Sequence, residues 1–244
     1  MPANIVTNDL GQPTGWAVAN WAPCERPERI AIEGRTCRLE PLDVARHAQH
    51  LFEANAQDVE GRNWTYMAYG PFSAFAEYEA WMKGIIARDD SVFYAIIDLD
   101  TGKAVGVAAL MRINPADGVI EIGHIAYSPL LQRKVAATEA MYLLMRYVFD
   151  DLGYRRYEWK CDSLNEASRH AAYRFGFTYE GLFRQATIYK GRNRDTAWFS
   201  IIDREWPGIK TAFEEWLKPE NFGDGGVQKV YLRDLIIQHR GVVR

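Results

Sequence analysis

The chain has 244 residues, of which 48% are hydrophobic and 25% are charged, and its formal net charge at pH 7 is −3. This length and apolar content suffice for one well-packed domain with extensions, so two full domains are not expected. A mildly acidic chain lacks the dominant basic surface of proteins that bind nucleic acid or anionic membranes, so neither partner is expected.

The three cysteines, Cys24, Cys37 and Cys161, are odd in number and widely spaced, with no Cys-x-x-Cys motif and no histidine pair nearby. Neither a disulfide framework nor a zinc site is indicated, so we expect no metal and a reducing, cytoplasmic location. The sequence has no stretch of about 18 uncharged apolar residues that would span a membrane. The stretch Met1 to Gly15 lacks the apolar core of a signal peptide.

Residues 1–29 combine Pro, Gly and Asn with two tryptophans, Trp16 and Trp21, and show no stable hydrophobic period. They are predicted to form an irregular N-terminal extension, with the two indole rings docked on the domain. Residues 30–218 form the predicted domain. Residues 219–244 are interpreted as a C-terminal tail with a glycine-rich break at 223–226.

Hydrophobic periodicity and turn residues predict the element order β-α-α-β-β-β-α-β-α-β-β, followed by one more helix. The predicted strands cover 30–39, 92–97, 104–113, 119–127, 154–161, 177–189 and 196–202, and the predicted helices cover 41–55, 73–88, a segment that ends at Leu152 and Gly153, 165–175 and 206–217.

The segment from Glu121 to Asp151 is the most informative part of the chain. A strand that ends at Ser128 and Pro129 leads through a short polar loop into a strongly periodic helix. The first amides of such a helix are unpaired and lie at the positive end of its dipole, which makes the loop an anion site with phosphate as its usual guest. Arg133 and Lys134 either add contacts to a diphosphate or form a solvated basic pair.

Two motifs in this half of the chain resemble those of the GNAT superfamily of N-acetyltransferases. Gln132 and the run Ala137 to Ala140 match the family pattern Gln/Arg-x-x-Gly-x-Gly/Ala with Ala-Thr-Glu-Ala, which is typical of the RimJ/RimL-like branch. Asn165, Ser168 and the Gly-Phe pair at 176–177 match the second motif. Val135 replaces the first glycine, so the loop needs a φ below zero there, or phosphate binding is weakened.

The resemblance implies the GNAT fold, an α/β (α+β) architecture with a mixed, mostly antiparallel central sheet flanked by helices. Its parallel pair, formed by 119–127 and 154–161, would splay at one end and leave backbone groups that a pantetheine arm can pair with. The implied cosubstrate is acetyl-CoA. The residues expected at the acyl-CoA site are Ile125, Ala126, Tyr127, Gln132, Arg133, Lys134, Val135, Ala136, Ala137, Thr138, Asn165 and Ser168.

Three side chains are candidates for acid and base chemistry. By resemblance, Tyr173 would protonate the leaving thiolate, although a half-buried packing role is equally consistent with its position. Glu121 or His124 would accept the proton of the amine, with Glu121 preferred and a surface glutamate as the alternative interpretation. Strand alternation places these two on opposite faces unless a bulge intervenes. The oxyanion donor would be a backbone N–H near Ile125 or Ala126.

Trp64, Tyr66 and Tyr69 lie where the family builds the wall of the acceptor site, and their rings either bind an alkylammonium group or pack the helices. Cys161 has no histidine at motif spacing, so it is interpreted as a core residue rather than a nucleophile. Asn165 is also a good helix N-cap, a role compatible with contact to the pantetheine arm.

The preferred function is transfer of an acetyl group from acetyl-CoA to a primary amine, either a small molecule or a protein N-terminus, by direct attack in a ternary complex. The alternative is a non-catalytic acyl-CoA-binding module with a degenerate phosphate loop. The sequence leaves open a longer acyl donor such as succinyl-CoA, and it also leaves open a homodimer completed by the tail.

Overall fold

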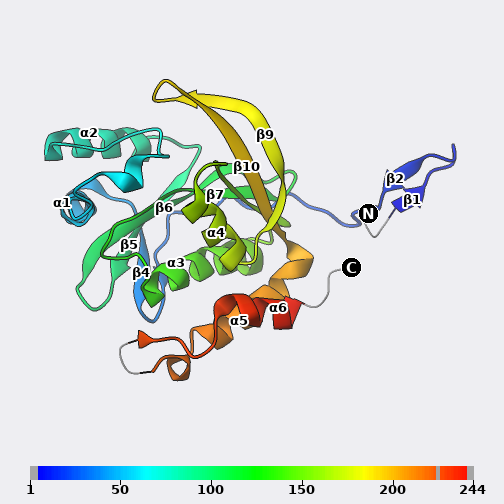
Figure 1. Ribbon diagram of the computed structural model, residues 1–244. Helices are drawn as coiled ribbons and strands as arrows, with labels where there is room; N and C mark the ends of the chain where they lie inside the picture. The colour runs from blue at the N-terminus through cyan, green and yellow to red at the C-terminus, as the bar shows by residue number, and fades with distance from the viewer. Residues whose placement is uncertain (1–4, 224–225, 241–244) are drawn as a thin grey trace.

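The computed structural model describes residues 5–223 and 226–240 (Figure 1). Residues 1–4, 224–225 and 241–244 lie outside the described residues, and they belong to the expected extension, the glycine-rich break and the end of the expected tail. No helix in the described ranges has the length and apolar character needed to cross a bilayer.

The fold is built on an eight-stranded mixed sheet with the strand order β3-β4-β5-β6-β7-β8-β10-β9. Only β7 and β8 are parallel, and every other neighbouring pair is antiparallel, which confirms the predicted sheet. The strands are β3 (Ile32–Glu33), β4 (Cys37–Pro41), β5 (Val92–Asp98), β6 (Lys103–Asn114), β7 (Val119–Tyr127), β8 (Arg156–Asp162), β9 (Thr178–Tyr189) and β10 (Arg192–Ile202).

Helices cover both faces of this sheet. The first face packs against α1 (Val44–Asn55) and α2 (Phe75–Ile86), and the second packs against α3 (Val135–Arg146), α4 (Glu166–Arg174), α5 (Trp206–Trp216) and α6 (Leu232–Arg240) (Figure 1). Because strand side chains alternate, Phe93 of β5 lies in the core with α1 and α2, whereas Tyr94 lies in the core with α3. We call these the α1/α2 face and the α3 face.

Four short segments complete the helical structure: the 3₁₀ turns Arg62–Trp64, Asp203–Glu205 and Pro219–Asn221, and the π turn Tyr147–Asp151 that prolongs α3. The Asp43 side chain accepts a hydrogen bond from the Arg46 amide and thereby caps α1. Gly176, which follows the predicted helix 165–175, has φ of +90° just after the last turn of α4.

The predicted strand 30–39 is divided into β3 and β4 by a tight turn, and a buried carboxylate of α3 holds this turn. Glu139 accepts hydrogen bonds from the amides of Arg35, Thr36 and Cys37 at 2.8, 2.6 and 3.1 Å, and from the Thr36 hydroxyl at 2.5 Å. A side chain at Gly34 would come within 2.7 Å of the Cys37 carbonyl oxygen. Glu139, matched above to a family motif, therefore fixes α3 against the turn between β3 and β4.

The N-terminal extension begins with a small exposed hairpin, β1 (Ile5–Thr7) and β2 (Pro13–Gly15), and then runs along the domain. Trp21 docks by donating from Nε1 to the Ala116 carbonyl at 2.7 Å, whereas Trp16 is 45% exposed. Further along, the Glu28 amide donates to the Tyr147 hydroxyl at 3.0 Å, and its carbonyl accepts from Tyr94 at 3.1 Å. Tyrosine hydroxyl groups thus hold the extension against the domain.

The described part of the segment 219–244 contains a helix that the sequence interpretation did not include. The α6 residues Leu232, Leu235 and Ile236 are buried in the same core as Ile209 of α5. Arg240 forms an ion pair with Glu205 at 2.6 Å and donates to the Gly176 carbonyl at 3.0 Å. This segment therefore closes the α3 face around α5.

Candidate active site

The parallel pair β7–β8 opens halfway along its length. Pairing runs from Val119 opposite Arg156 to Ile122 opposite Trp159, and the rest of both strands is unpaired across the gap. On its other side β7 stays paired with β6 as far as Tyr127. The predicted splay is therefore present, and the backbone groups of β7 from Gly123 to Tyr127 border it.

A β-bulge lies at the point where the two strands separate. Val107 pairs with Ala126 and Ala109 pairs with Gly123, so β7 contains one extra residue at His124 and Ile125. His124 takes the left-handed conformation there, with φ of +49°. The bulge cancels the alternation that would place Glu121 and His124 on opposite faces.

Contacts show that Glu121 and His124 share the α1/α2 face. Ile120 and Ile122, the neighbours of Glu121, lie in the core of the α3 face, so Glu121 faces the other way. The His124 ring lies against Phe93, with 4.9 Å between ring centroids, and Phe93 belongs to the α1/α2 core. The two base candidates are therefore on one side of the sheet.

His124 is a half-buried imidazole in an aromatic setting. Its Nδ1 lies 3.1 Å from the Tyr69 hydroxyl, and the Tyr69 ring stacks on it at 5.7 Å between centroids. Among the described residues its Nε2 has no hydrogen-bond partner. Burial lowers the pKa of His124, and the Arg88 guanidinium adds to this effect, so the imidazole is neutral at pH 7.

Glu121, the preferred base in the sequence analysis, is part of a buried network of charges. Lys160 lies 2.7 Å from both Glu121 and Glu158, and the Arg112 guanidinium lies 3.2 Å from Glu121. The Lys160 ammonium lies 3.8 Å from the centroid of the Trp198 ring. Burial raises the pKa of Glu121, and the Lys160 ammonium opposes this shift. Since the Glu121 carboxylate is already paired with two cations, Lys160 and Arg112, its geometry fits a structural role better than that of a base.

The loop before α3 has its left-handed residue at Arg133, whose φ is +63°, and not at Val135. Val135 is the first residue of α3 and has φ below zero, so the absence of glycine there costs the loop no strain. Among the described residues the amides of Arg133, Val135 and Ala136 have no acceptor. These free amides at the start of a helix are what a diphosphate requires.

Most of the polar side chains of this loop already have partners within the protein. Gln132 donates to the Tyr127 carbonyl at 2.8 Å and to the Asn63 side chain at 3.0 Å. Lys134 forms an ion pair with Asp98 at 3.1 Å. Thr138 accepts from Arg174 at 2.9 Å, whereas Arg133 forms no ion pair within the described chain. The groups of this loop that remain free for an anion are therefore the backbone amides and the Arg133 side chain, because Lys134 is already paired with Asp98.

Asn165 and Ser168 form the beginning of α4 beside the end of β8. The Asn165 side chain accepts from the Ser168 amide at 3.0 Å, which is the expected N-cap, and the Ser168 hydroxyl accepts from the Trp159 indole at 3.0 Å. Both side chains thus fix the helix start near the gap. Burial raises the pKa of Cys161 near the end of β8, consistent with its assignment to the core.

Tyr173, the proposed proton donor, lies away from the gap. Its ring meets Phe199 of β10 edge-on with 5.3 Å between centroids, and the residue is 44% exposed. Since β8 separates β10 from β7, this phenol lies on the far side of the gap's second strand. The adjacent Ala172 is the residue that α4 buries in the core, and this geometry gives Tyr173 a packing role.

A cleft of about 450 Å³ opens next to the end of β8. The loop 60–71 forms one wall with Trp64 and Tyr66, and the β9–β10 hairpin forms the opposite wall with Tyr189 and Lys190. Tyr66 donates to the Leu164 carbonyl at 3.0 Å, and Lys190 donates to the Trp64 carbonyl at 2.8 Å. Two of the three predicted wall aromatics therefore line this cleft, while the third, Tyr69, contacts His124.

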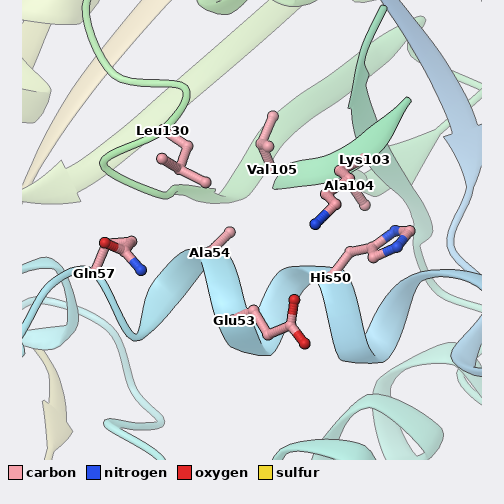
Figure 2. A pocket seen from close by; sticks show the side chains of 8 residues that line it. All are labelled: His50, Glu53, Ala54, Gln57, Lys103, Ala104, Val105 and Leu130. Carbon is pink, nitrogen blue, oxygen red and sulfur yellow. The ribbon is translucent and has the colours of Figure 1, made fainter. Parts of the chain in front are cut away.

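A second, smaller hollow of about 170 Å³ lies between α1 and the beginning of β6 (Figure 2). Its lining includes Ala54 on the helix, Val105 on the strand and Leu130 from the loop that follows β7. None of the residues that border the β7–β8 gap lines it. The larger cleft is therefore the candidate acceptor site.

Among the lining residues that sequence reasoning missed is Asp162, the last residue of β8. It is 5% exposed and accepts hydrogen bonds from the Tyr189 hydroxyl at 2.8 Å and the Leu164 amide at 2.9 Å. Regular pairing of β8 with β10 places it on the same face as Lys160, two residues earlier. A charged residue where a buried strand ends beside a gap is the signal that would have found it.

Comparison with known proteins agrees with this architecture. A family model described as an acetyltransferase (GNAT) domain matches residues 37–178. The crystal structure of a GCN5-related N-acetyltransferase from Brucella melitensis is 51% identical, with a TM-score of 0.88 over 90% of this chain and 99% of that chain.

Two proteins of Bacillus are also similar. The N-acetyltransferase p20 of Bacillus licheniformis, described as uncharacterized, is 32% identical over 70% of this chain and 100% of its own length. YdaF of Bacillus subtilis (strain 168), provisionally named a ribosomal N-acetyltransferase, is 28% identical over 77% of this chain and 98% of its own. Because the family model spans more than half of the chain, the chain belongs to the GNAT family and is an N-acetyltransferase that uses acetyl-CoA.

Proposed function

We propose that this enzyme acetylates the α-amino group of a protein or peptide, in the manner of the RimJ/RimL-like branch, by direct attack within a ternary complex. One observation carries the proposal: the loop 60–71 that lines the 450 Å³ cleft also brings Tyr69 against His124, which lies at the bulge on the unpaired edge of β7.

The donor site consists of backbone groups. The free amides of Arg133, Val135 and Ala136 bind the diphosphate, and the pantetheine arm pairs with the exposed edge of β7 between Gly123 and Tyr127. Asn165 and Ser168 border this arm from the start of α4. Since these contacts use the main chain, they do not require the glycine that Val135 replaces.

His124 is the base in this proposal. An α-ammonium group has a pKa of about 8, so a neutral imidazole with a lowered pKa accepts its proton readily near neutral pH. The amine nitrogen then bonds to the carbonyl carbon and the C–S bond breaks. The second proton of the amine nitrogen passes to the departing sulfur, so CoA is released as the thiol. In the active tautomer Nδ1–H donates to the Tyr69 oxygen, which leaves the lone pair of Nε2 free.

A backbone N–H of the bulge stabilises the oxyanion that develops on the thioester carbonyl. Amides near Ile125 and Ala126 lie on the stretch of β7 that has no partner on β8, so they are available for this contact. Such a preorganised donor typically contributes about 3 kcal/mol to transition-state stabilisation.

Two observations favour a peptide acceptor. The cleft is larger than a single amine requires and has aromatic walls at Trp64, Tyr66 and Tyr189. In addition, YdaF carries a name that assigns it ribosomal N-acetylation. An extended peptide N-terminus fits an opening of this size with its ammonium group inward.

The test is thiol release from acetyl-CoA with a panel of acceptors, followed by mass spectrometry of the products. We expect acetylation of peptides with a free α-amino group and none of the same peptides blocked at the N-terminus but retaining an internal lysine. Binding of acetyl-CoA without thiol release for any amine, or acetylation of lysine side chains alone, would contradict the proposal.

A further inference from the structure

The described part of the chain contains six buried carboxylates, and most are neutralised by the protein itself. They are Glu40, Asp98, Glu121, Glu139, Glu158 and Asp162. Four of them have an Arg, Lys or His nitrogen within ion-pair distance, and only Glu139 and Asp162 have none. A buried carboxylate without a cation is costly unless hydrogen bonds replace the lost water.

Glu139 and Asp162 differ in how well they are satisfied. Glu139 accepts four hydrogen bonds from the β3–β4 turn and lies inside the molecule. Asp162 accepts only two, from Tyr189 and Leu164, and it lines the acceptor cleft. Its oxygens retain lone pairs that no group of the described chain uses, so a cationic ligand is the partner that its environment lacks.

The same cleft also contains positive charge that no carboxylate of the described chain neutralises. Lys190 and Arg192 both line it, and neither has a carboxylate partner within the described ranges. Glu60, the other acid of the cleft, is already paired with Arg62. Burial lowers the pKa of Lys190, and the neighbouring Arg192 guanidinium adds to this effect. An anionic group bound between them would relieve the repulsion between the two cations.

From these charges we infer that Asp162 binds the ammonium group of the acceptor, and that Lys190 and Arg192 bind a negative group of the same molecule. The acceptor is therefore zwitterionic: either a free amino acid, or a peptide whose first residues include a carboxylate side chain. Trp64 and Tyr66 also line this cleft, and aromatic residues in such a cleft favour a cationic ligand. This inference rests on the proposed function and adds the chemical class of its substrate.

In this arrangement Asp162 binds the ammonium group and His124 accepts its proton. The two residues lie on the strands that border the gap and share the α1/α2 face. Asp162 holds the ammonium form as it enters, and His124 then accepts one proton as the nitrogen approaches the thioester. Asp162 is thus an acceptor-binding residue, and its loss should raise KM for the acceptor more than it lowers kcat.

The main experiment compares wild-type enzyme with Asp162→Asn, which keeps the shape and retains an oxygen for the Leu164 amide. We expect KM for the acceptor to rise about tenfold or more, as for the loss of a charge-assisted hydrogen bond. The Kd for acetyl-CoA and the melting temperature should stay unchanged. The matched control is Asp100→Asn, which removes one exposed carboxylate from the β5–β6 turn and should alter nothing.

A second measurement uses the wild-type enzyme, so it does not depend on the folding of any variant. Free amino acids, peptides beginning with Ala-Glu, and peptides beginning with Ala-Lys are compared by kcat/KM. Desamino analogues of the best substrate serve as competitive inhibitors. We expect an amino acid or the Ala-Glu peptide to exceed the Ala-Lys peptide at least tenfold, and the desamino analogue to bind at least tenfold more weakly than the amine.

The outcomes separate this inference from the proposed function. Active wild-type enzyme with an unchanged acceptor KM in Asp162→Asn, or with a preference for Ala-Lys, overturns the inference and leaves the acetyltransferase proposal intact. Wild-type enzyme that binds acetyl-CoA but acetylates no amine overturns the proposed function. Preference for Ala-Glu identifies an acidic N-terminus as the acceptor. Preference for an amino acid over every peptide supports the zwitterionic acceptor of this inference and overturns the peptide acceptor of the proposed function.

Discussion

The two halves of β7 are consecutive stretches of one strand with opposite roles. The half from Val119 to Ile122 is paired on both sides, and at its last rungs Lys160 joins Glu121 to Glu158. The half from Gly123 to Tyr127 is paired with β6 alone and contains the bulge at His124. The comparison shows that a buried ion-pair network joins β7 to β8 next to the residues where the two strands separate.

The largest expected effect comes from disrupting the ion-pair network in the half of β7 that pairs with β8, residues 119–122. Lys160→Met leaves Glu121 and Glu158 buried without their shared cation, so we expect the free energy of unfolding to fall by about 3–5 kcal/mol. Urea denaturation measures this change. The control is Lys210→Met, which breaks an exposed pair with Asp150 and should cost less than about 1 kcal/mol. Equal effects of the two changes would show that the Lys160 network does not hold the strands together.

The open half of β7, residues 123–127 without a partner on β8, is tested by His124→Gln. This change removes the proposed base and keeps a polar side chain at the bulge. We expect kcat/KM to fall about 100-fold or more, as for the loss of general-base catalysis, while the Kd for acetyl-CoA stays within about twofold. His170→Gln changes an exposed histidine of α4 and should leave both constants unchanged. A fall in donor affinity equal to the fall in kcat/KM would assign His124 to binding instead.

The imidazole itself gives a test by pH. Because burial lowers the pKa of His124, its NMR titration should have a midpoint below the ordinary histidine value of about 6.5. Between the two pKa values the unfolded chain binds more protons than the folded one. The contribution of His124 to stability is therefore complete above pH ~6.5 and is lost as pH falls through the lowered value. A midpoint above 6.5 would contradict the buried, neutral imidazole.

A smaller effect distinguishes two residues that follow the open half in the chain, Arg133 in the loop and Val135 at the start of α3. Val135→Gly restores the family pattern but removes a partly buried side chain from a helix start, so we expect a loss of about 1 kcal/mol in stability and no gain in acetyl-CoA affinity. Arg133→Gly relieves the left-handed φ and removes a cation, so it should stabilise the fold slightly and weaken acetyl-CoA binding several-fold. Tighter binding by Val135→Gly would show that glycine is needed at that position.

The smallest effect is expected at Tyr173. Tyr173→Phe keeps the ring against Phe199 and removes only an exposed hydroxyl group, so kcat should change less than about twofold. Tyr69→Phe, which removes the hydroxyl group beside His124, should lower kcat more. A fall of tenfold or more in Tyr173→Phe alone would restore Tyr173 as the proton donor.

The parallel pair was expected from the resemblance to the GNAT family. The sequence predicted the element order and the flanking helices because these depend on local period and on turn residues. It predicted the α4 N-cap at Asn165 for the same reason. The position of Tyr173 depends instead on helical phase. One residue turns a helix by about 100°, and since Ala172 faces the core, Tyr173 faces β10.

Other features of the site depend on contacts between distant segments, which no local pattern contains. The bulge at His124 is visible only in the register with β6, and it overrides the expected alternation of Glu121 and His124. Glu139 belongs to a motif by sequence, but its four hydrogen bonds reach a turn about 100 residues away. Asp162 is a charged residue at the end of a buried strand, but its lack of a cationic partner is visible only by comparison with the other buried acids.

The most direct test of the central claim is a crystal structure of the enzyme with CoA. The account predicts that the diphosphate lies on the amides of Arg133, Val135 and Ala136, and that the pantetheine arm runs along β7 beside the bulge with its sulfur between β7 and β8. A diphosphate bound elsewhere, or a gap filled by protein side chains in the complex, would contradict the account.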